Sequence, residues 1–518
     1  MKKIFIALLL CVLCGGLQAQ GYEIGIKIKS IPGDTVILGH HFNERLIPDD
    51  TVKLDSKGYG VFKGKKKLPG GMYFIFMPNR NYFDILIDDN QKFSIENDTT
   101  PADFLKNMVI TGDLQNQLFV DYQKFLAQCR SDYEHASTDE EKAAINQRVE
   151  EHYSQQITKY PNMFFSSFLT ATREVEVPAS ITDQNERYFY YKAHYFDNFN
   201  VSDGRLLRTV LYEPKVQRYI DNVVLQIPDS LIKETNWLVE KTRPKGKLVK
   251  GENDELFRFM LVYFFNKYAK SESMMAENVY CSLADIYAKD AVWDTDSFKT
   301  ELKKKVAKKK NCLVGNMSKD LVLQRLPNDT NRINALKPFT EVLKTKGADL
   351  EKNKPDFEDR RDDVVQILDD LVNKFDGYID MHKTPAKYTL IVFWEPDCSH
   401  CKEEMPKLFQ YYKDTLQAEG VKVWAVYMNR SVDKLPDLHR HINKWFDFVK
   451  EKKMMADGWI NCWNPFDQYR DNFDVNSTPT FYLLDDKKEI IAKRISHQQA
   501  YELIRMIEDD KAKRAENK

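Results

Sequence analysis

An early stretch of the chain alternates apolar and polar side chains, as a half-buried β-strand does. Ile24, Ile26 and Ile28 are separated by mostly polar neighbours, and similar short segments follow, divided by turn residues such as 69–71. No constellation of catalytic residue types is evident here. We therefore predict an antiparallel β domain over residues 20–112.

Further along, the apolar positions take the period of a helix. Residues 138–141 read Thr-Asp-Glu-Glu, which is a capping box at the start of a charged helix. The aromatic cluster 188–191 is interpreted as packing between helix faces. The lysine-rich run 303–310 is interpreted as the solvated end of a helix, not as a nucleic-acid patch. These patterns predict an α-helical domain over residues 113–311.

The pattern changes again at Tyr388–Trp394, which is a continuous apolar run. Such a run is typical of a strand that is buried on both faces of a sheet covered by helices. The elements predicted after it are a helix to about Gln417, strand Val421–Tyr427, helix Leu438–Lys450, strands Thr480–Leu484 and Glu489–Arg494, and helix Gln498–Asp510.

This order predicts an α/β domain over residues 312–518. The polar, helix-prone segment around 331–380 is interpreted as a helical insertion or connector within that domain. The predicted fold class is therefore multidomain: an antiparallel β domain, an α-helical middle region and a C-terminal α/β domain.

The first residues are predicted to be a cleaved signal peptide, residues 1–19. Two lysines precede a short apolar run that ends in small residues near Ala19. Leucine precedes both Cys11 and Cys14, which disfavours a lipid anchor, and no later run is long enough to span a membrane. We expect export to the periplasm without a stable membrane anchor.

Composition narrows the class of partner. The chain has 77 basic and 78 acidic side chains, a net charge of −1, so no overall field favours nucleic acid. Removal of the signal peptide leaves cysteines too sparse for a disulfide scaffold. Two of them, Cys398 and Cys401, lie three residues apart, which points to redox chemistry or metal binding. Whether the other four form pairs is left open: Cys129, Cys281, Cys312 and Cys462.

The Cys398–Cys401 pair stands where the buried strand gives way to a helix. A cysteine at a helix N-terminus lies near unpaired backbone N–H groups, which favour the thiolate. Cys398 is therefore predicted to be the nucleophile. Cys401, one turn later, is predicted to resolve the mixed disulfide. His400 lies between them, and its imidazole is expected to stabilise the Cys398 thiolate further.

Three alternatives were weighed for this pair. A zinc site needs two further ligands, and the spacing of His439 and His441 does not suit that role. A peroxidase of the peroxiredoxin type would have threonine three residues before its reactive cysteine, where this chain has Glu395. A non-catalytic docking module would not need the intact pair. Thiol–disulfide exchange is therefore preferred to these three alternatives.

At these residues the C-terminal region resembles a thioredoxin-like domain of the exported type found in Gram-negative envelopes, related to cytochrome-c-maturation reductases. The matching residues are Phe393-Trp394, Cys398-Ser399-His400-Cys401, Glu404, Pro406 and Ser477-Thr478-Pro479-Thr480-Phe481. The resemblance implies that the Thr478–Pro479 bond is cis, that Pro479 lies beside the cysteine pair, and that Thr478 binds the substrate backbone.

The resemblance also assigns roles to two other residues. Glu404 is expected to transfer a proton to or from Cys401, and Trp394 is expected to contact the substrate. The chain departs from the family in having Asp397 before the first cysteine and Ser-His between the thiols. A carboxylate beside Cys398 is expected to raise its pKa.

The sequence thus predicts a periplasmic disulfide reductase or isomerase that acts on protein disulfides by mixed-disulfide exchange. No bound cofactor and no metal are expected. Electrons would come from a periplasmic or membrane thiol partner. Because every reactive feature follows Cys312, residues 312–518 are expected to carry the chemistry alone, while residues 21–310 select the substrate or position the domain.

Overall fold

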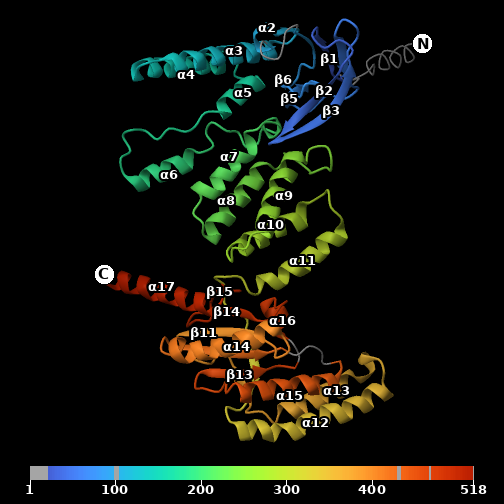
Figure 1. The fold of residues 1–518 in the computed structure, drawn as a ribbon, viewed down its shortest axis with the longest axis vertical. Helices are drawn as coiled ribbons and strands as arrows, with labels where there is room; N and C mark the ends of the chain where they lie inside the picture. The colour runs from blue at the N-terminus through green and yellow to red at the C-terminus, as the bar shows by residue number, and fades with distance from the viewer. Residues whose placement is uncertain (1–20, 98–103, 429–432, 466–467, 517–518) are drawn as a thin grey trace, which may run out of the picture. The chain divides into compact units, whose positions relative to one another are not determined.

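The computed structural model describes residues 21–97, 104–428, 433–465 and 468–516. Contacts divide the chain after Val262 into two compact units. Figure 1 labels their helices and strands. The predicted signal peptide lies outside the described residues. The domain boundaries proposed from the sequence remain predictions, and the one at 311/312 falls inside the second unit. Within the described ranges, no helix combines the length and apolar character needed to cross a membrane.

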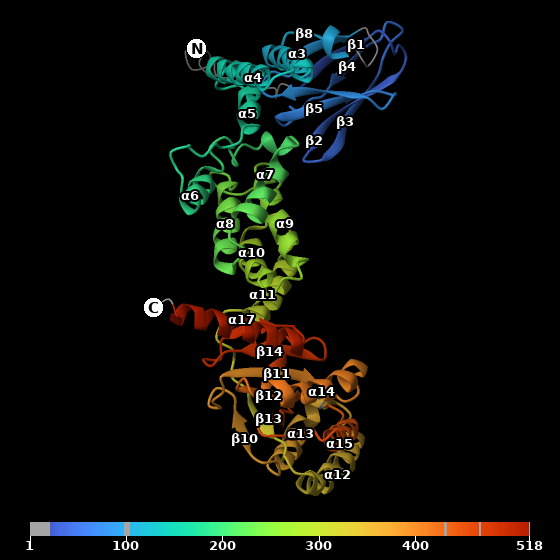
Figure 2. The ribbon, with the colours of Figure 1, turned by 60° about the vertical axis from the view of Figure 1, so that its left-hand side comes forward.

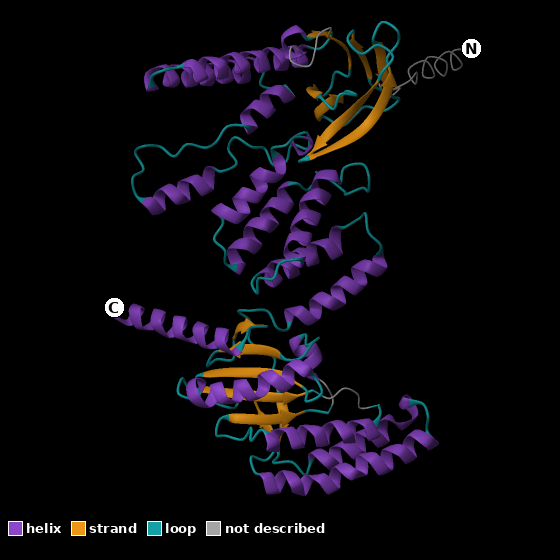
Figure 3. Cartoon of the chain, viewed as in Figure 1, coloured by secondary structure: helices purple, strands orange, loops and turns teal. Residues whose placement is uncertain are grey.

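Two four-stranded sheets open the N-terminal unit (Figure 3). Their orders are β4-β1-β7-β8 and β3-β2-β5-β6. The strands are β1 Glu23–Ile28, β2 Thr35–Phe42, β3 Arg45–Lys53, β4 Tyr59–Lys63, β5 Gly71–Phe76, β6 Tyr82–Ile87, β7 Lys92–Asn97 and β8 Val109–Thr111. Ile24, Ile26 and Ile28 lie in the core, as the alternation predicts. The antiparallel β region is confirmed, although β1 and β7 run parallel.

Helices follow these sheets. They are α2 Phe104–Asn107, α3 Leu114–His135, α4 Asp139–Lys159, α5 Phe164–Ala171, α6 Gln184–His194, α7 Tyr212–Arg218, α8 Pro228–Lys241 and α9 Glu255–Ala269. The predicted capping box is present at α4, where the N–H of Glu141 donates to the Thr138 hydroxyl and the N–H of Thr138 donates to the Glu141 carboxylate. The helical middle region is therefore confirmed.

The aromatic cluster 188–191 bears out the packing interpretation only in part. It lies on α6, where no side chain is fully buried, and Phe189 is 64% exposed. Tyr191 packs edge-on against the buried Tyr195, and the Tyr188 hydroxyl donates to the Val223 carbonyl oxygen, 3.0 Å away. The half-buried rings therefore pack at the edge of the helical region, whereas Phe189 faces solvent.

A seven-stranded mixed sheet forms the centre of the C-terminal unit, in the order β10-β9-β13-β12-β11-β14-β15. The strands are β9 Val322–Arg325, β10 Tyr378–Asp380, β11 Tyr388–Trp394, β12 Val421–Tyr427, β13 Trp459–Trp463, β14 Thr480–Leu484 and β15 Ile490–Lys493. The helices are α10 Ala276–Asp290, α11 Asp296–Lys310, α12 Thr330–Asn353, α13 Phe357–Val372, α14 Ser399–Tyr411, α15 Leu435–Glu451, α16 Gln468–Phe473 and α17 His497–Glu516.

Every residue of β11 is buried, as its continuous apolar run predicts. Because side chains alternate along a strand, Leu390 and Val392 enter one core cluster, whereas Ile391 and Phe393 enter the cluster on the opposite face. The helix α14 lies along this sheet in both views (Figures 1 and 2). The predicted α/β fold is therefore confirmed.

Three strands were not predicted: β9, β10 and β13. In β13 all five residues are buried, including Asn461. That amide is satisfied inside the core, since it donates to the Met454 carbonyl oxygen at 2.7 Å and accepts from the Trp459 indole at 3.2 Å. A polar residue such as Asn461 interrupts the apolar pattern of a short buried strand. The sequence does not show the hydrogen-bond partners that allow its burial, so the strand was missed.

The segment 331–380, predicted to be a helical insertion or connector, consists largely of two helices. Its helices α12 and α13 place Ile333, Leu343 and Val364 in the same core cluster as α14 and α15. Gly347 on α12 allows close approach to α15, because a Cβ there would lie 2.5 Å from the Leu435 Cβ. The segment is therefore an integral part of this core.

Candidate active site

The two thiols lie at the junction of β11 and α14. Cys398 is the N-cap residue of α14, and its carbonyl oxygen accepts a hydrogen bond from the Lys402 N–H at 3.1 Å. The first turn of a helix has N–H groups without helical partners, and here these groups point toward the Cys398 side chain. The location of Cys398 at a helix start agrees with the sequence analysis.

The two sulfurs have different environments. Cys398 is partly exposed, whereas Cys401 is fully buried. Burial alone would raise the pKa of Cys398, but the backbone N–H groups of Cys401 and His400 and contacts with Thr478 outweigh burial and lower it. Burial, together with the neighbouring Cys398, raises the pKa of Cys401 to about 12. Thus the accessible thiol is also the one that ionises more readily.

The loop before β14 completes the site from the other side. Strand β14 pairs antiparallel with β11, so that Thr480 lies opposite Phe393. This pairing brings the Thr478 carbonyl oxygen to 3.3 Å from the Cys398 sulfur, where it accepts the thiol hydrogen. The Thr478–Pro479 bond is cis, as the resemblance implied.

The contact between His400 and Cys398 is made by the main chain, and the predicted role of the imidazole stays a prediction. The side chain of His400 is exposed, and the contribution of this residue to the Cys398 sulfur comes from its backbone N–H. Position 400 therefore affects the thiolate through the main chain, a contribution that any residue except proline would supply.

Asp397 is paired with two basic side chains from α15, His441 and Lys444. Its carboxylate accepts from His441 Nδ1 at 2.5 Å and from Lys444 Nζ at 2.7 Å. Burial alone would raise the pKa of Asp397, but Lys444 and His441 hold it below its usual value. Asp397 was expected to raise the pKa of Cys398. It is not among the groups that shift this pKa, and its carboxylate is paired with His441 and Lys444 instead.

Glu404 does not contact Cys401. Its carboxylate binds Lys407 Nζ at 3.0 Å and lies 3.9 Å from His497 Nδ1. Cys401 points into the core, whereas Glu404 is partly exposed one turn later. The structure therefore gives no direct path for the proton transfer that was predicted for Glu404.

His497 is a site neighbour that the sequence did not identify. It lies at the start of α17, its side chain is buried, and its ring packs edge-on against Tyr411. Burial lowers its pKa, so the ring favours the neutral form. No local motif marks this residue, because the two residues that it contacts, Glu404 and Tyr411, lie almost a hundred positions earlier in the chain.

Trp394 corrects a further prediction. Its side chain has 0% exposure and packs against the Phe448 ring at 5.4 Å. A fully buried ring has no surface to offer a substrate, so Trp394 supports the site from beneath. Of the residues predicted to contact the substrate, Thr478 borders the sulfur of Cys398, and the role of Pro479, which follows it through the cis bond, remains a prediction.

The remaining cysteines and histidines have other contacts. Cys129, Cys281, Cys312 and Cys462 are buried free thiols. His439 lies 3.0 Å from a Glu341 carboxylate oxygen. Throughout the described part of the chain, no group of three or more His, Cys, Asp or Glu side chains is arranged to hold a metal ion.

Comparisons with known protein families match three parts of the chain. Residues 22–119 match a domain of unknown function (DUF4369), residues 113–311 match another (DUF5106), and residues 386–490 match a thioredoxin-like family. No curated protein matches the chain.

Several solved structures are similar to parts of the chain. A thioredoxin-like protein from Bacteroides caccae is 16% identical with a TM-score of 0.39, covering 64% of this chain and 98% of that chain. The thioredoxin domain of a thiol-disulfide oxidoreductase from Bacteroides vulgatus is 21% identical with a TM-score of 0.21, covering 25% and 86%. StoA from Bacillus subtilis is 22% identical with a TM-score of 0.20, covering 25% and 87%. The family match over residues 386–490 includes both thiols and the cis-proline loop, and the C-terminal unit has a thioredoxin-like α/β fold.

Proposed function

We propose that the protein is a thiol–disulfide oxidoreductase that exchanges disulfides with protein substrates through Cys398 and Cys401. The observation that carries this proposal is the asymmetry of the pair. The partly exposed sulfur of Cys398 has a lowered pKa at the start of α14, and the sulfur of Cys401 lies buried behind it with a raised pKa. A nucleophile and a resolving thiol require this difference.

In the first step, the Cys398 thiolate attacks one sulfur of a substrate disulfide. A bond forms between Cys398 and that sulfur, and the other substrate sulfur leaves as a thiolate that takes up a proton. The backbone N–H groups that stabilised the thiolate become free once the negative charge has left Cys398.

In the second step, Cys401 attacks the Cys398 sulfur and releases the second substrate thiol. Burial and then the charge of Cys398 raise the Cys401 pKa, and the second of these causes disappears in the mixed disulfide. Deprotonation of Cys401 therefore becomes easier when its nucleophilic attack is required. Two electrons pass to the substrate, and the protein is left with a Cys398–Cys401 disulfide.

The same proposal includes the cellular setting expected from the sequence. The pattern of residues 1–19 supports export to the periplasm. A periplasmic or membrane thiol partner would then reduce the Cys398–Cys401 disulfide and restore the enzyme for reductase or isomerase turnover.

Trapping tests the chemistry. A reduced Cys401→Ala variant, mixed with native, disulfide-bonded insulin as the probe, should accumulate a mixed disulfide at Cys398, because the resolving thiol is missing. Cys398→Ala is the matched control and should form none, while the unmodified protein should reduce insulin. Absence of a mixed disulfide in Cys401→Ala, together with absence of insulin reduction by the unmodified protein, would contradict the proposed function.

A further inference from the structure

A large charged pocket lies within the C-terminal unit, outside the thiol pair. Its volume is about 830 Å³, and it lies between the helical segment 268–309 and four residues that flank β14: Asp474 and Asn476 in the preceding loop, and Lys493 and Arg494 after it. The helix α11 forms one wall, and the strand β15 forms part of the floor. A volume of this order accommodates several residues of a peptide.

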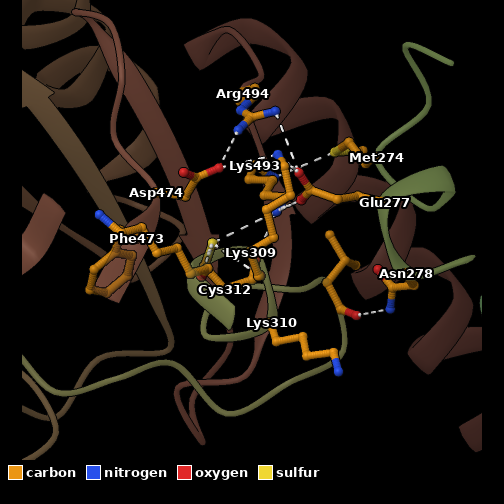
Figure 4. A network of polar contacts seen from close by, with 12 residues as sticks. Met274, Glu277, Asn278, Lys309, Lys310, Cys312, Phe473, Asp474, Lys493 and Arg494 are labelled. Carbon is orange, nitrogen blue, oxygen red and sulfur yellow. Dashed lines mark hydrogen bonds and ion pairs between the residues drawn. The ribbon is translucent and has the colours of Figure 1, made fainter. Parts of the chain in front are cut away.

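The floor of the pocket is a network of paired charges (Figure 4). Lys493, whose side chain is only 2% exposed, forms an ion pair with Glu277 and donates to the Cys312 carbonyl oxygen at 2.8 Å. Lys309 bridges the two carboxylates of the floor, at 2.5 Å from Glu277 and 3.2 Å from Asp474. Since these groups satisfy one another, the floor is fixed and its carboxylates are neutralised.

The rim has a surplus of positive charge. Six basic and four acidic side chains line the whole pocket. On α11, Lys304 pairs with Glu301 and Lys308 pairs with Asp471, but all four of these side chains are more than half exposed. Such exposed pairs contribute little and exchange readily with other anions. Lys305 is exposed and forms no ion pair with any described residue.

The pocket and the thiol site share the loop that precedes β14. Asn476 lines it, and two residues later Thr478 places its carbonyl oxygen 3.3 Å from the Cys398 sulfur. Two residues of chain span at most about 7 Å. A substrate whose cysteine is bonded to Cys398 could therefore extend into the pocket within a few residues of that cysteine.

We propose that this pocket binds an acidic stretch of the protein whose disulfide reacts at Cys398, so that α11 selects substrates by charge. The proposal rests on the proposed function and names its substrate class. The occupant is a polypeptide because the pocket holds several residues and opens beside the loop that borders the reactive sulfur.

The experiment compares two peptides that carry the same intramolecular disulfide. One has three Glu residues next to its cysteines, and the other has three Gln residues. The reduced full-length protein is mixed with each, and the rate of peptide reduction is measured in a single turnover. We expect the acidic peptide to react about fivefold faster at low salt, and this preference should shrink at high salt because exposed charges are screened.

Two matched variants test whether a lysine that lines the pocket causes the preference for the acidic peptide. Lys305→Glu changes an exposed lysine in the pocket, and Lys303→Glu changes an exposed lysine on the same helix that does not line it. Lys305→Glu should abolish the preference for the acidic peptide, whereas Lys303→Glu should keep it. Both should reduce a small neutral disulfide at the rate of the unmodified protein. Equal rates for the two peptides, or equal losses in the two variants, would overturn the proposal.

A binding measurement separates this inference from the proposed chemistry. Fluorescent peptides with serine in place of both cysteines are titrated with the full-length protein, and anisotropy reports binding. The acidic peptide should bind about fivefold more tightly than the Gln peptide, which is about 1 kcal/mol at 1.4 kcal/mol per factor of ten. Selective binding without disulfide reduction would contradict the proposed function alone. Reduction without selective binding would contradict the acidic pocket alone.

Discussion

The sulfur of Cys398 lies 3.3 Å from the carbonyl oxygen of Thr478, although 80 positions separate the two residues in the chain. The pairing of β11 with β14 produces this contact, because β11 ends shortly before Cys398 and β14 begins shortly after Thr478. The reactive thiol is therefore held between a helix start, which stabilises its anion, and a loop that borders the space where a substrate sulfur must arrive.

The first prediction concerns the order in which the thiols react. At pH 7.5 a limiting amount of iodoacetamide should label Cys398 well before Cys401, because Cys398 is more exposed and its pKa is lowered, whereas the pKa of Cys401 is raised to about 12. Peptide mapping by mass spectrometry measures the labelling. Equal labelling of the two thiols would contradict the assigned roles.

The second prediction concerns the pairing of Asp397 with His441 and Lys444. Asp397→Asn should lower the free energy of unfolding by about 1 kcal/mol at pH 7, since Lys444 and His441 lose their carboxylate partner. The pKa of Asp397 is below its ordinary value of 3.8 in the folded state, so this stabilisation is complete well above pH 3.8 and disappears as pH falls through the folded-state pKa.

Urea unfolding at pH 7 and at pH values below 4 measures this difference. Asp437→Asn serves as the control, because Asp437 lies on the same helix in an exposed pair with Arg440. That control should change stability by only a few tenths of a kcal/mol. A loss for Asp397→Asn that stays constant as the pH falls would show that the ion pairs are not its cause.

Much of the thiol site was predictable because its signals are local. The apolar run of β11, the spacing of Cys398 and Cys401 and the start of a helix all lie within a short stretch of sequence. The contacts of Asp397 were not predictable. They come from α15, and nothing in the sequence around Asp397 shows which helix will face it.

The errors have the same physical origin. The role of Glu404 at Cys401 was implied by the family resemblance, but Lys407 and His497 lie closer to its carboxylate. Trp394 continues the alternation of β11, which turns its ring toward the core, and burial of this kind depends on the neighbouring helix. Local periodicity identifies the elements, while tertiary packing determines the partners of each side chain.

The third prediction separates the backbone and side chain of residue 400. His400→Pro should stabilise the Cys398–Cys401 disulfide, because proline lacks the N–H that helps to stabilise the Cys398 thiolate. Loss of about 1.4 kcal/mol corresponds to a potential about 30 mV more negative. His400→Ala keeps the N–H and should leave the potential almost unchanged. Redox titration in glutathione buffers measures both, and an equal shift in His400→Ala would assign the effect to the imidazole.

The fourth prediction concerns the smallest piece of chain that folds around the thiols. The sequence suggested residues 312–518, but that fragment lacks Glu277, the partner of the buried Lys493. Burial alone would raise the pKa of Glu277, but Lys493 and Lys309 hold it below its usual value, so the pair is ionised. An unpaired buried charge costs about 3–5 kcal/mol. A fragment of residues 263–518 keeps both partners and follows the boundary of the compact unit.

We therefore expect the 263–518 fragment to unfold cooperatively in urea and to reduce a small disulfide. The 312–518 fragment should be several kcal/mol less stable or fail to fold, as monitored by circular dichroism. Glu277→Gln in the full chain tests the cause separately, because it removes the charge on Glu277 with little change in volume, and it should destabilise the C-terminal unit. Lys310→Gln is the control, since the pair of Lys310 with Asp285 is exposed. Equal stability of the two fragments would show that α10 and α11 are not needed to balance the charge of Lys493.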